Sequence, residues 1–143
     1  MSNRLLLKGF EVELFTGRNT GEHVGVASCV VKDLTGFVNE PDQRNLEYTT
    51  FPEDTYTNLR EYLLKPRRQL RQWLMPRDLT LLPGSTLSLG DSRRFERSDT
   101  MNSYHDFIEG IYGTSVVTAS VHINLGLENL PLLFAALRLV RCE

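Results

Sequence analysis

The 143-residue sequence contains only two cysteines, Cys29 and Cys142, and neither belongs to a CxxC pair. Neither a zinc knuckle nor a disulfide framework is indicated, and we expect two reduced thiols. No apolar run approaches the roughly 20 residues that a membrane span needs. The three leucines before Lys8 are too few for the apolar core of a signal peptide. These absences predict a cytoplasmic protein without a membrane partner.

The sequence also lacks an excess of positive charge. Sixteen Lys and Arg residues stand against eighteen Asp and Glu residues, which gives a net charge of -2 and predicts no nucleic-acid partner. The nucleotide-binding and hydrolase motifs GxxxxGK[ST], GxGxxG, GxSxG and HExxH are absent as well. With 41% hydrophobic residues, the length fits a single domain spanning residues 1–143.

Strict alternation of apolar and polar residues predicts three strands, over residues 5–15, 44–50 and 117–125. The second of these can pair with the first. Residues 23–31 favour a strand, or a strand followed by a turn. Residues 79–89 predict a short strand that runs into a loop.

Helical spacing of apolar residues predicts a helix over residues 53–74, with acidic residues at its start and basic residues in its second half. Pro66 should kink this helix or split it in two, because it removes a backbone donor. Residues 103–112 predict a short helix that Gly113 ends.

The last part of the sequence predicts a helix that is apolar on nearly every side. Asn129 suits its cap, and residues 130–143 need burial on several faces. We therefore expect a complementary chain or a second copy to cover it. The expected fold class is α+β, an antiparallel sheet with an acidic concave face, backed on one side by the helices at 53–75 and 130–143.

Acidic side chains gather on the predicted sheet. Glu11 and Glu13 lie two residues apart on a strand, so their side chains leave the same face about 6.5–7 Å apart. If residues 44–50 pair antiparallel beside them, Glu47 joins that face. A solvated sheet face is the ordinary alternative, although such faces usually mix charge signs. Oxygen ligands with one histidine suit Mg²⁺ or Mn²⁺, so both interpretations stay open.

Two further patterns have a chemical and an ordinary interpretation. His105 and Glu109 stand four residues apart and could form a metal pair, but a contact on a helix surface is favoured. Arg93, Arg94 and Arg97 follow the predicted loop and could receive an anion or lie in solvent.

Four segments occur in an order that resembles the amino-terminal half of glutamate–cysteine ligases, in particular the cyanobacterial type. They are residues 8–14 (KGFEVEL), 40–50 (EPDQRNLEYTT), 83–90 (PGSTLSLG) and 112–124 (YGTSVVTASVHIN). The resemblance implies a fold of the glutamine synthetase-like superfamily. It also implies an enzyme that uses ATP to phosphorylate the side-chain carboxylate of L-glutamate and lets the amine of L-cysteine attack the acyl phosphate. The product is γ-glutamylcysteine, the precursor of glutathione.

The resemblance further implies which residues form the site. Divalent ions, Mg²⁺ or Mn²⁺, would be held against the phosphates of ATP by Glu11, Glu13, Glu40, Glu47 and His122. The substrates would be bordered by Thr86, Ser88, Thr118, Ser120 and Asn124, with Arg94 as an anion contact. Metal charge on the phosphate oxygens is also what phosphoryl transfer to a carboxylate requires.

Members of that family are much longer, and their later half supplies arginines and further metal contacts. We therefore expect this chain to be the amino-terminal part of a ligase catalytic domain, with a site that is incomplete unless a second chain completes it. Two other functions stay open. One is a different ATP-dependent carboxylate–amine ligase, and the other is a catalytically silent fragment that binds a partner through residues 130–143.

Overall fold

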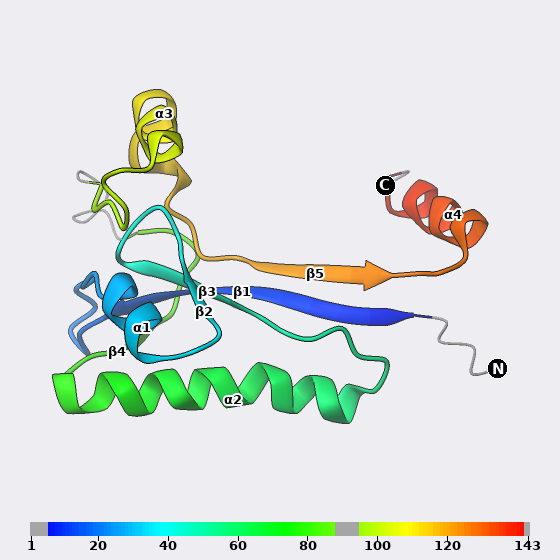
Figure 1. Ribbon diagram of the computed structural model, residues 1–143, viewed down its shortest axis with the longest axis horizontal. Helices are drawn as coiled ribbons and strands as arrows, with labels where there is room; N and C mark the ends of the chain where they lie inside the picture. The colour runs from blue at the N-terminus through cyan, green and yellow to red at the C-terminus, as the bar shows by residue number, and fades with distance from the viewer. Residues whose placement is uncertain (1–5, 88–94, 142–143) are drawn as a thin grey trace.

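The computed structural model describes residues 6–87 and 95–141, in which five antiparallel strands form one sheet accompanied by four α-helices (Figure 1). The α+β class predicted from the sequence is confirmed. The elements follow one another as β1 (Leu7–Gly17), α1 (Ala27–Asp33), β2 (Phe37–Asn39), β3 (Asn45–Thr49), α2 (Tyr56–Leu74), β4 (Thr80–Leu82), α3 (Ser103–Tyr112), β5 (Val121–Gly126) and α4 (Leu130–Arg141).

The long strand β1 lies at the centre of the sheet. The strand order is β2-β3-β1-β4, and β5 also pairs with β1. Glu11 and Val12 pair with β3 and with β5 at once, so β5 lies on the edge of β1 opposite β3. The antiparallel pairing of β1 with the strand predicted at residues 44–50 is therefore confirmed.

The two faces of the sheet differ in chemistry. One face is apolar and packs against α2, which runs along the sheet in Figure 1. Its buried side chains come from β1, β3 and α2, and they include Val12, Leu14, Leu46, Tyr48, Leu70 and Leu74. The intervening residues of β1 and β3 point to the other face, where the glutamates lie. Period-2 alternation thus separates the hydrophobic core from the acidic face.

The prediction of a strand at residues 23–31 was wrong, because α1 occupies most of that segment. Four β-branched valines in this stretch favour a strand, but contacts from elsewhere in the chain favour the helix. The backbone N–H of Ala27 donates to the carbonyl of Gln43 at 2.9 Å, and the N–H of Ser28 donates to its side-chain Oε1 at 3.0 Å. Gln43 therefore satisfies donors of the first helical turn that would otherwise lack partners.

Helix α2 runs without interruption through Pro66, so the predicted split does not occur. Leu59 and Leu70, on either side of the proline, are both buried, so packing stabilises the helix on both sides of Pro66. The fully buried Tyr48 donates its hydroxyl to the carbonyl of Leu63 at 2.8 Å, one turn before the proline. Burial raises the pKa of Tyr48 to about 12, so this hydroxyl stays a donor.

The third helix follows the prediction, and β5 starts later than expected. α3 spans Ser103–Tyr112 and ends at Gly113, whose positive φ of 57° suits a glycine. β5 begins at Val121 rather than at residue 117. The preceding residues instead form a 3₁₀ turn and an isolated bridge between Thr86 and Thr118.

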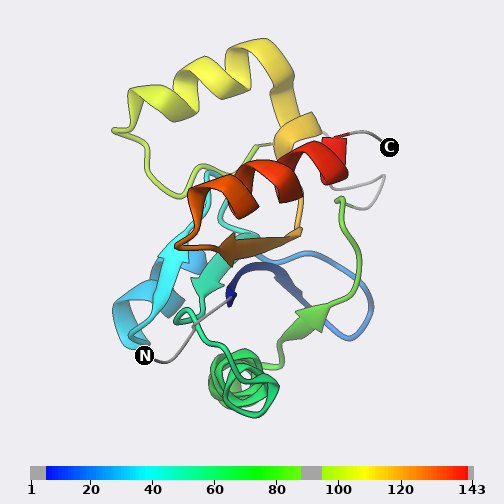
Figure 2. The same ribbon diagram turned by 90° about the vertical axis from the view of Figure 1, so that its right-hand side faces the viewer.

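Helix α4 lies on the side of the sheet opposite α2, as does α3 (Figures 1 and 2). The expectation that helices 53–75 and 130–143 back the same face was therefore wrong. Residues 127–129 are the whole connection to β5, and this short link leaves α4 beside the end of that strand. The predicted cap is confirmed, because the Asn129 side chain accepts the N–H of Leu132 at 3.0 Å. None of the helices in residues 6–87 and 95–141 is long and apolar enough to cross a membrane.

Replacing Tyr48 by Phe should lower the free energy of unfolding by about 1 kcal/mol, because the buried hydrogen bond to the helix carbonyl is lost while packing is kept. Urea denaturation measures the change. Tyr62→Phe, in the same helix and half-exposed, is the control and should change stability less. Equal midpoints for the wild type and Tyr48→Phe would contradict the stabilising role of the hydroxyl.

Candidate metal centre

The register of β1 against β3 places two carboxylates opposite each other. Glu13 pairs directly with Glu47 on the acidic face of the sheet. Cβ atoms of such cross-strand pairs lie about 4.5–5.5 Å apart. Like charges at this distance repel, so the pairing needs a compensating interaction or a chemical use.

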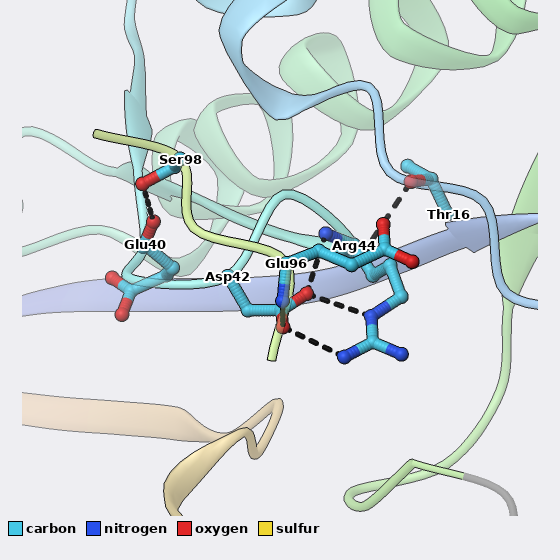
Figure 3. A network of polar contacts seen from close by, with 6 residues as sticks. All are labelled: Thr16, Glu40, Asp42, Arg44, Glu96 and Ser98. Carbon is cyan, nitrogen blue, oxygen red and sulfur yellow. Dashed lines mark hydrogen bonds and ion pairs between the residues drawn. The ribbon is translucent and has the colours of Figure 1, made fainter. Parts of the chain in front are cut away.

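A third carboxylate reaches the same point from a loop. Glu40 follows β2 and precedes β3, and Figure 3 shows the loop that carries it. Glu13, Glu40 and Glu47 each offer a carboxylate oxygen within 4.8 Å of the others. We call these three residues the acidic triad. Among the residues that the structure describes, it is the one such group of three His, Cys, Asp or Glu side chains.

The electrostatics of the acidic triad reflect crowding of negative charge. The pKa of Glu40 is raised from 4.5 to about 7, first by partial burial and then by the charges of Glu13 and Glu47. The pKa of Glu47 is also raised, first by burial and then by Glu11 and Glu13. Hard carboxylate oxygens, partly buried and short of positive charge, form a donor set that fits Mg²⁺ or Mn²⁺.

Glu11 and His122 form a separate pair beside the acidic triad. Their strands place them opposite each other, and His122 Nδ1 lies 2.9 Å from Glu11 Oε2. Asn124 donates its side-chain amide to the other oxygen of Glu11 at 3.0 Å. The hydrogen bond to His122 lowers the pKa of Glu11, and the same bond raises the pKa of His122. The sequence predicted that the carboxylates of Glu11, Glu13 and Glu47 converge. In the structure Glu40 joins Glu13 and Glu47 instead, and Glu11 pairs with His122.

Ser120 links the two groups. Its backbone N–H donates to Glu13 Oε2 at 2.9 Å, and its hydroxyl lies 3.1 Å from His122 Nε2. Both ring nitrogens of His122 therefore have polar neighbours. The chain just before β5 consequently fixes the orientation of a triad carboxylate as well as that of the histidine.

A cavity of about 630 Å³ opens beside the acidic triad. Glu13 and Glu40 line one part of it, together with Thr118, Ser120 and His122. The opposite wall comes from α3 and contributes Tyr104, His105, Phe107, Ile108 and Tyr112. This aromatic wall was not predicted as part of a site, although its residues recur at helical spacing. The cavity therefore joins a hard-oxygen donor set to an apolar surface.

The remaining residues predicted to border the substrates, where the structure describes them, lie at different distances from the cavity. Thr86 bridges to Thr118 and so lies near the cavity edge, whereas Asn124 lies beside Glu11. The predicted Ser88 and Arg94 lie outside the described residues.

The residues considered for a helix metal pair have other partners. His105 is buried with Nδ1 3.2 Å from the carbonyl of Asp99, and Glu109 accepts from Arg97 Nε at 2.7 Å. Arg97 also forms an ion pair with Asp106. The two arginine contacts attach the segment around residue 97 to α3. This arginine therefore serves as a link between two segments rather than as an open anion site.

Comparisons with known proteins give one family and, separately, one similar fold. A family model described as glutamate–cysteine ligase family 2 matches residues 7–142. A search of the curated proteins found no match. Among solved structures, a bifunctional glutathione synthetase from Pasteurella multocida is similar, with a TM-score of 0.71 and 17% sequence identity. The match covers 95% of this chain and 19% of that chain, so it shows the shared fold over a small part of the larger protein.

Replacing Glu40 by Gln should raise the melting temperature of the metal-free protein at pH 8 by a few degrees. The raised pKa means that the folded state binds this proton more tightly than the unfolded state. The stability that the proton on Glu40 contributes is thus complete below pH 4.5 and is lost as the pH rises through about 7. Thermal unfolding followed by circular dichroism, with a chelator present, should show a much smaller difference at pH 4.5. Identical melting temperatures at pH 8 would contradict the crowding of charge.

Proposed function

The chain belongs to glutamate–cysteine ligase family 2, and from this premise we propose that it serves ATP-dependent ligation of L-glutamate to L-cysteine. In the proposed reaction the γ-carboxylate of glutamate attacks the γ-phosphorus of ATP, and ADP leaves. The amine of cysteine then attacks the acyl carbon, and phosphate leaves. The product is γ-glutamylcysteine, formed in the first step of glutathione biosynthesis. We further propose that the chain is the amino-terminal part of a catalytic domain of the cyanobacterial type.

The convergence of Glu13, Glu40 and Glu47 is the observation that supports this proposal most directly. Transfer of a phosphoryl group to a carboxylate brings two anions together, and the reaction needs positive charge on the phosphate oxygens. The acidic triad would hold Mg²⁺ or Mn²⁺, which supplies that charge when bound. Glu11 and His122 would join as ligands of a neighbouring ion, after giving up their mutual hydrogen bond.

The cavity beside the acidic triad is the proposed place for the substrates. Thr118 and Ser120 line it and offer polar atoms next to Glu13. The aromatic wall of α3 lines the opposite side. We propose roles in substrate binding for Thr86, Ser88, Thr118, Ser120 and Asn124, with Arg94 as a contact for an anionic group.

The proposed active site draws on a second polypeptide. Leu139 and Val140 in α4 are 73% and 76% exposed, and Ile123 in β5 is 64% exposed. We call the exposed apolar side chains of α4 the apolar row, namely Leu130, Leu132, Phe134, Leu137, Leu139 and Val140. An apolar surface of this kind commonly marks a place that another protein covers. We propose that a complementary chain or a second copy buries α4. The match covers 19% of the synthetase chain, so we propose that these 143 residues supply a part of the active site.

Two alternative functions can be distinguished from the proposed ligation by experiment. A different amine in place of cysteine would keep the metal site and the ATP chemistry. A catalytically silent interaction module would keep the apolar surface of α4 without needing the acidic triad. The apolar row of α4 is the observation that favours the second alternative.

Replacing Glu13 by Gln should weaken Mn²⁺ binding at least about tenfold, because the ion loses one carboxylate and its charge. Isothermal titration calorimetry compares this variant with the wild type and with Glu22→Gln. Glu22 is exposed and paired with Arg18, which makes it the matched control. Equal and negligible heats for all three proteins would favour the silent module.

A coupled assay of ADP release identifies the amine substrate. With ATP and glutamate present, cysteine should raise the rate above that seen with aminobutyrate or other amines. The assay is run with the chain and, where one is found, its complementary chain. A rate indifferent to cysteine would contradict the named reaction and favour another carboxylate–amine ligase.

Replacing Leu137 by Glu should disrupt any assembly that buries α4. This side chain is 48% exposed on the apolar row, and a charge there could not enter a dry interface. Sedimentation velocity should show a larger species for the wild type, alone or with its complementary chain, and a monomer for the variant. Monomeric behaviour of both proteins under all conditions would contradict the proposed partner.

A further inference from the structure

Glu40 differs from its two triad partners in how the fold holds it. Glu13 and Glu47 lie on paired strands, whose hydrogen bonds fix their positions. Glu40 lies outside the strands, in the loop between β2 and β3. The charges of Glu13 and Glu47 repel it, so an untethered loop would carry the carboxylate toward solvent. Some other contact must therefore keep Glu40 in place.

The contact is a buried ion pair two residues further along the loop (Figure 3). Asp42 and Arg44 are 1% and 2% exposed. Arg44 donates Nε to Asp42 Oδ1 at 2.8 Å and Nη2 to Oδ2 at 2.7 Å, which is a two-pronged pairing. The backbone N–H of Arg44 also donates to Oδ1 at 2.9 Å. These bonds close the loop into a fixed turn.

Residues 96–98 form hydrogen bonds to the same loop. The N–H of Glu96 donates to Asp42 Oδ2 at 2.8 Å, so four hydrogen bonds end on this one carboxylate. The N–H of Ser98 donates to the carbonyl of Pro41 at 3.0 Å, and its hydroxyl donates to the carbonyl of Glu40. The backbone of Glu40 is thus held directly, and the backbone after it is held through Asp42.

We propose that the Asp42–Arg44 pair positions Glu40 in the acidic triad and is required for metal affinity. The inference rests on the metal site of the proposed function. A buried ion pair adds little net stability compared with packed apolar side chains, because both charges lose their hydration. Its contribution here is geometric, since it holds a carboxylate against the repulsion of two others. Asp42 and Arg44 are therefore positioning residues, which act through Glu40.

The test measures Mn²⁺ affinity by titration of the full chain and its Asp42→Asn variant. An amide in this place cannot accept from all four donors, so the turn loosens and the affinity should fall about 10- to 100-fold. A double-mutant cycle adds Glu40→Gln. If Asp42 acts through Glu40, Asp42→Asn should cause no further loss in the Glu40→Gln background. An equal loss in both backgrounds would overturn the inference.

Two controls separate positioning from general stability. Val30→Ala removes fully buried apolar volume from α1 and should lower the melting temperature without changing Mn²⁺ affinity. Arg44→Lys keeps the charge but cannot form two parallel bonds, so its affinity should lie between those of the wild type and Asp42→Asn. It also serves as the test variant if Asp42→Asn does not fold. An equal loss of affinity in Val30→Ala would overturn the inference.

A crystal structure of the metal-free Asp42→Asn variant, or of Arg44→Lys in its place, distinguishes failure of the inference from failure of the proposed function. The Glu40 carboxylate should move out of the 4.8 Å reach of Glu13 and Glu47. An unchanged triad would overturn the positioning role whatever the metal affinity. A wild type that binds no Mn²⁺ would overturn the metal site, while the position of Glu40 would still decide the role of Asp42.

Discussion

The pairing of Glu13 with Glu47 across two central strands is the constraint that organises this molecule. Side chains alternate between the two faces, so a slip of one residue in either strand would turn the glutamate of that strand into the hydrophobic core. The register is held by the apolar side chains on the opposite face, among them Val12 and Tyr48, which pair with each other and pack with α2. The core therefore fixes the distance between two charges that would otherwise separate.

The remaining parts of the acidic face can be understood as responses to that crowding. Glu11 shares its charge with His122 through a hydrogen bond, and Glu13 accepts a backbone N–H from Ser120. Glu40 has a pKa of about 7, so near neutral pH its carboxyl is protonated in part of the molecules, which reduces the negative charge of the triad. If the acidic triad holds a metal ion as proposed, that ion would compete with this proton.

The same segment that tethers the Glu40 loop also holds the aromatic wall. Residues 96–98 bond to the loop on one side, and Arg97 pairs with Asp106 and Glu109 of α3 on the other. The two walls of the cavity are therefore connected through one short stretch of chain. These contacts connect the two walls directly, without involving the sheet.

The sequence predicted the parts of the molecule that are periodic. Alternation in β1 and β3 gave their pairing and placed Glu13 and Glu47 on one face, both confirmed. Glu40 stands in a loop without periodicity, and only the family resemblance pointed to it. The Asp42–Arg44 turn carries no such signal, because its effect depends on a segment more than fifty residues away. α1 was mistaken for a strand because its first-turn donors bond to Gln43, a tertiary contact that local propensity cannot reveal.

The long β1 strand also sets an order for assembly on the ribosome. Its partner β3 follows closely in the chain, whereas Ser120 lies 107 residues after Glu13 and His122 lies 111 residues after Glu11. During synthesis β1 can therefore pair with β3 on one edge long before β5, which pairs with Leu7–Val12 on the other edge, has emerged. Over that interval the nascent chain presents unpaired backbone N–H and C=O groups along half of its central strand. Such an open edge is a target for chaperones and a starting point for aggregation.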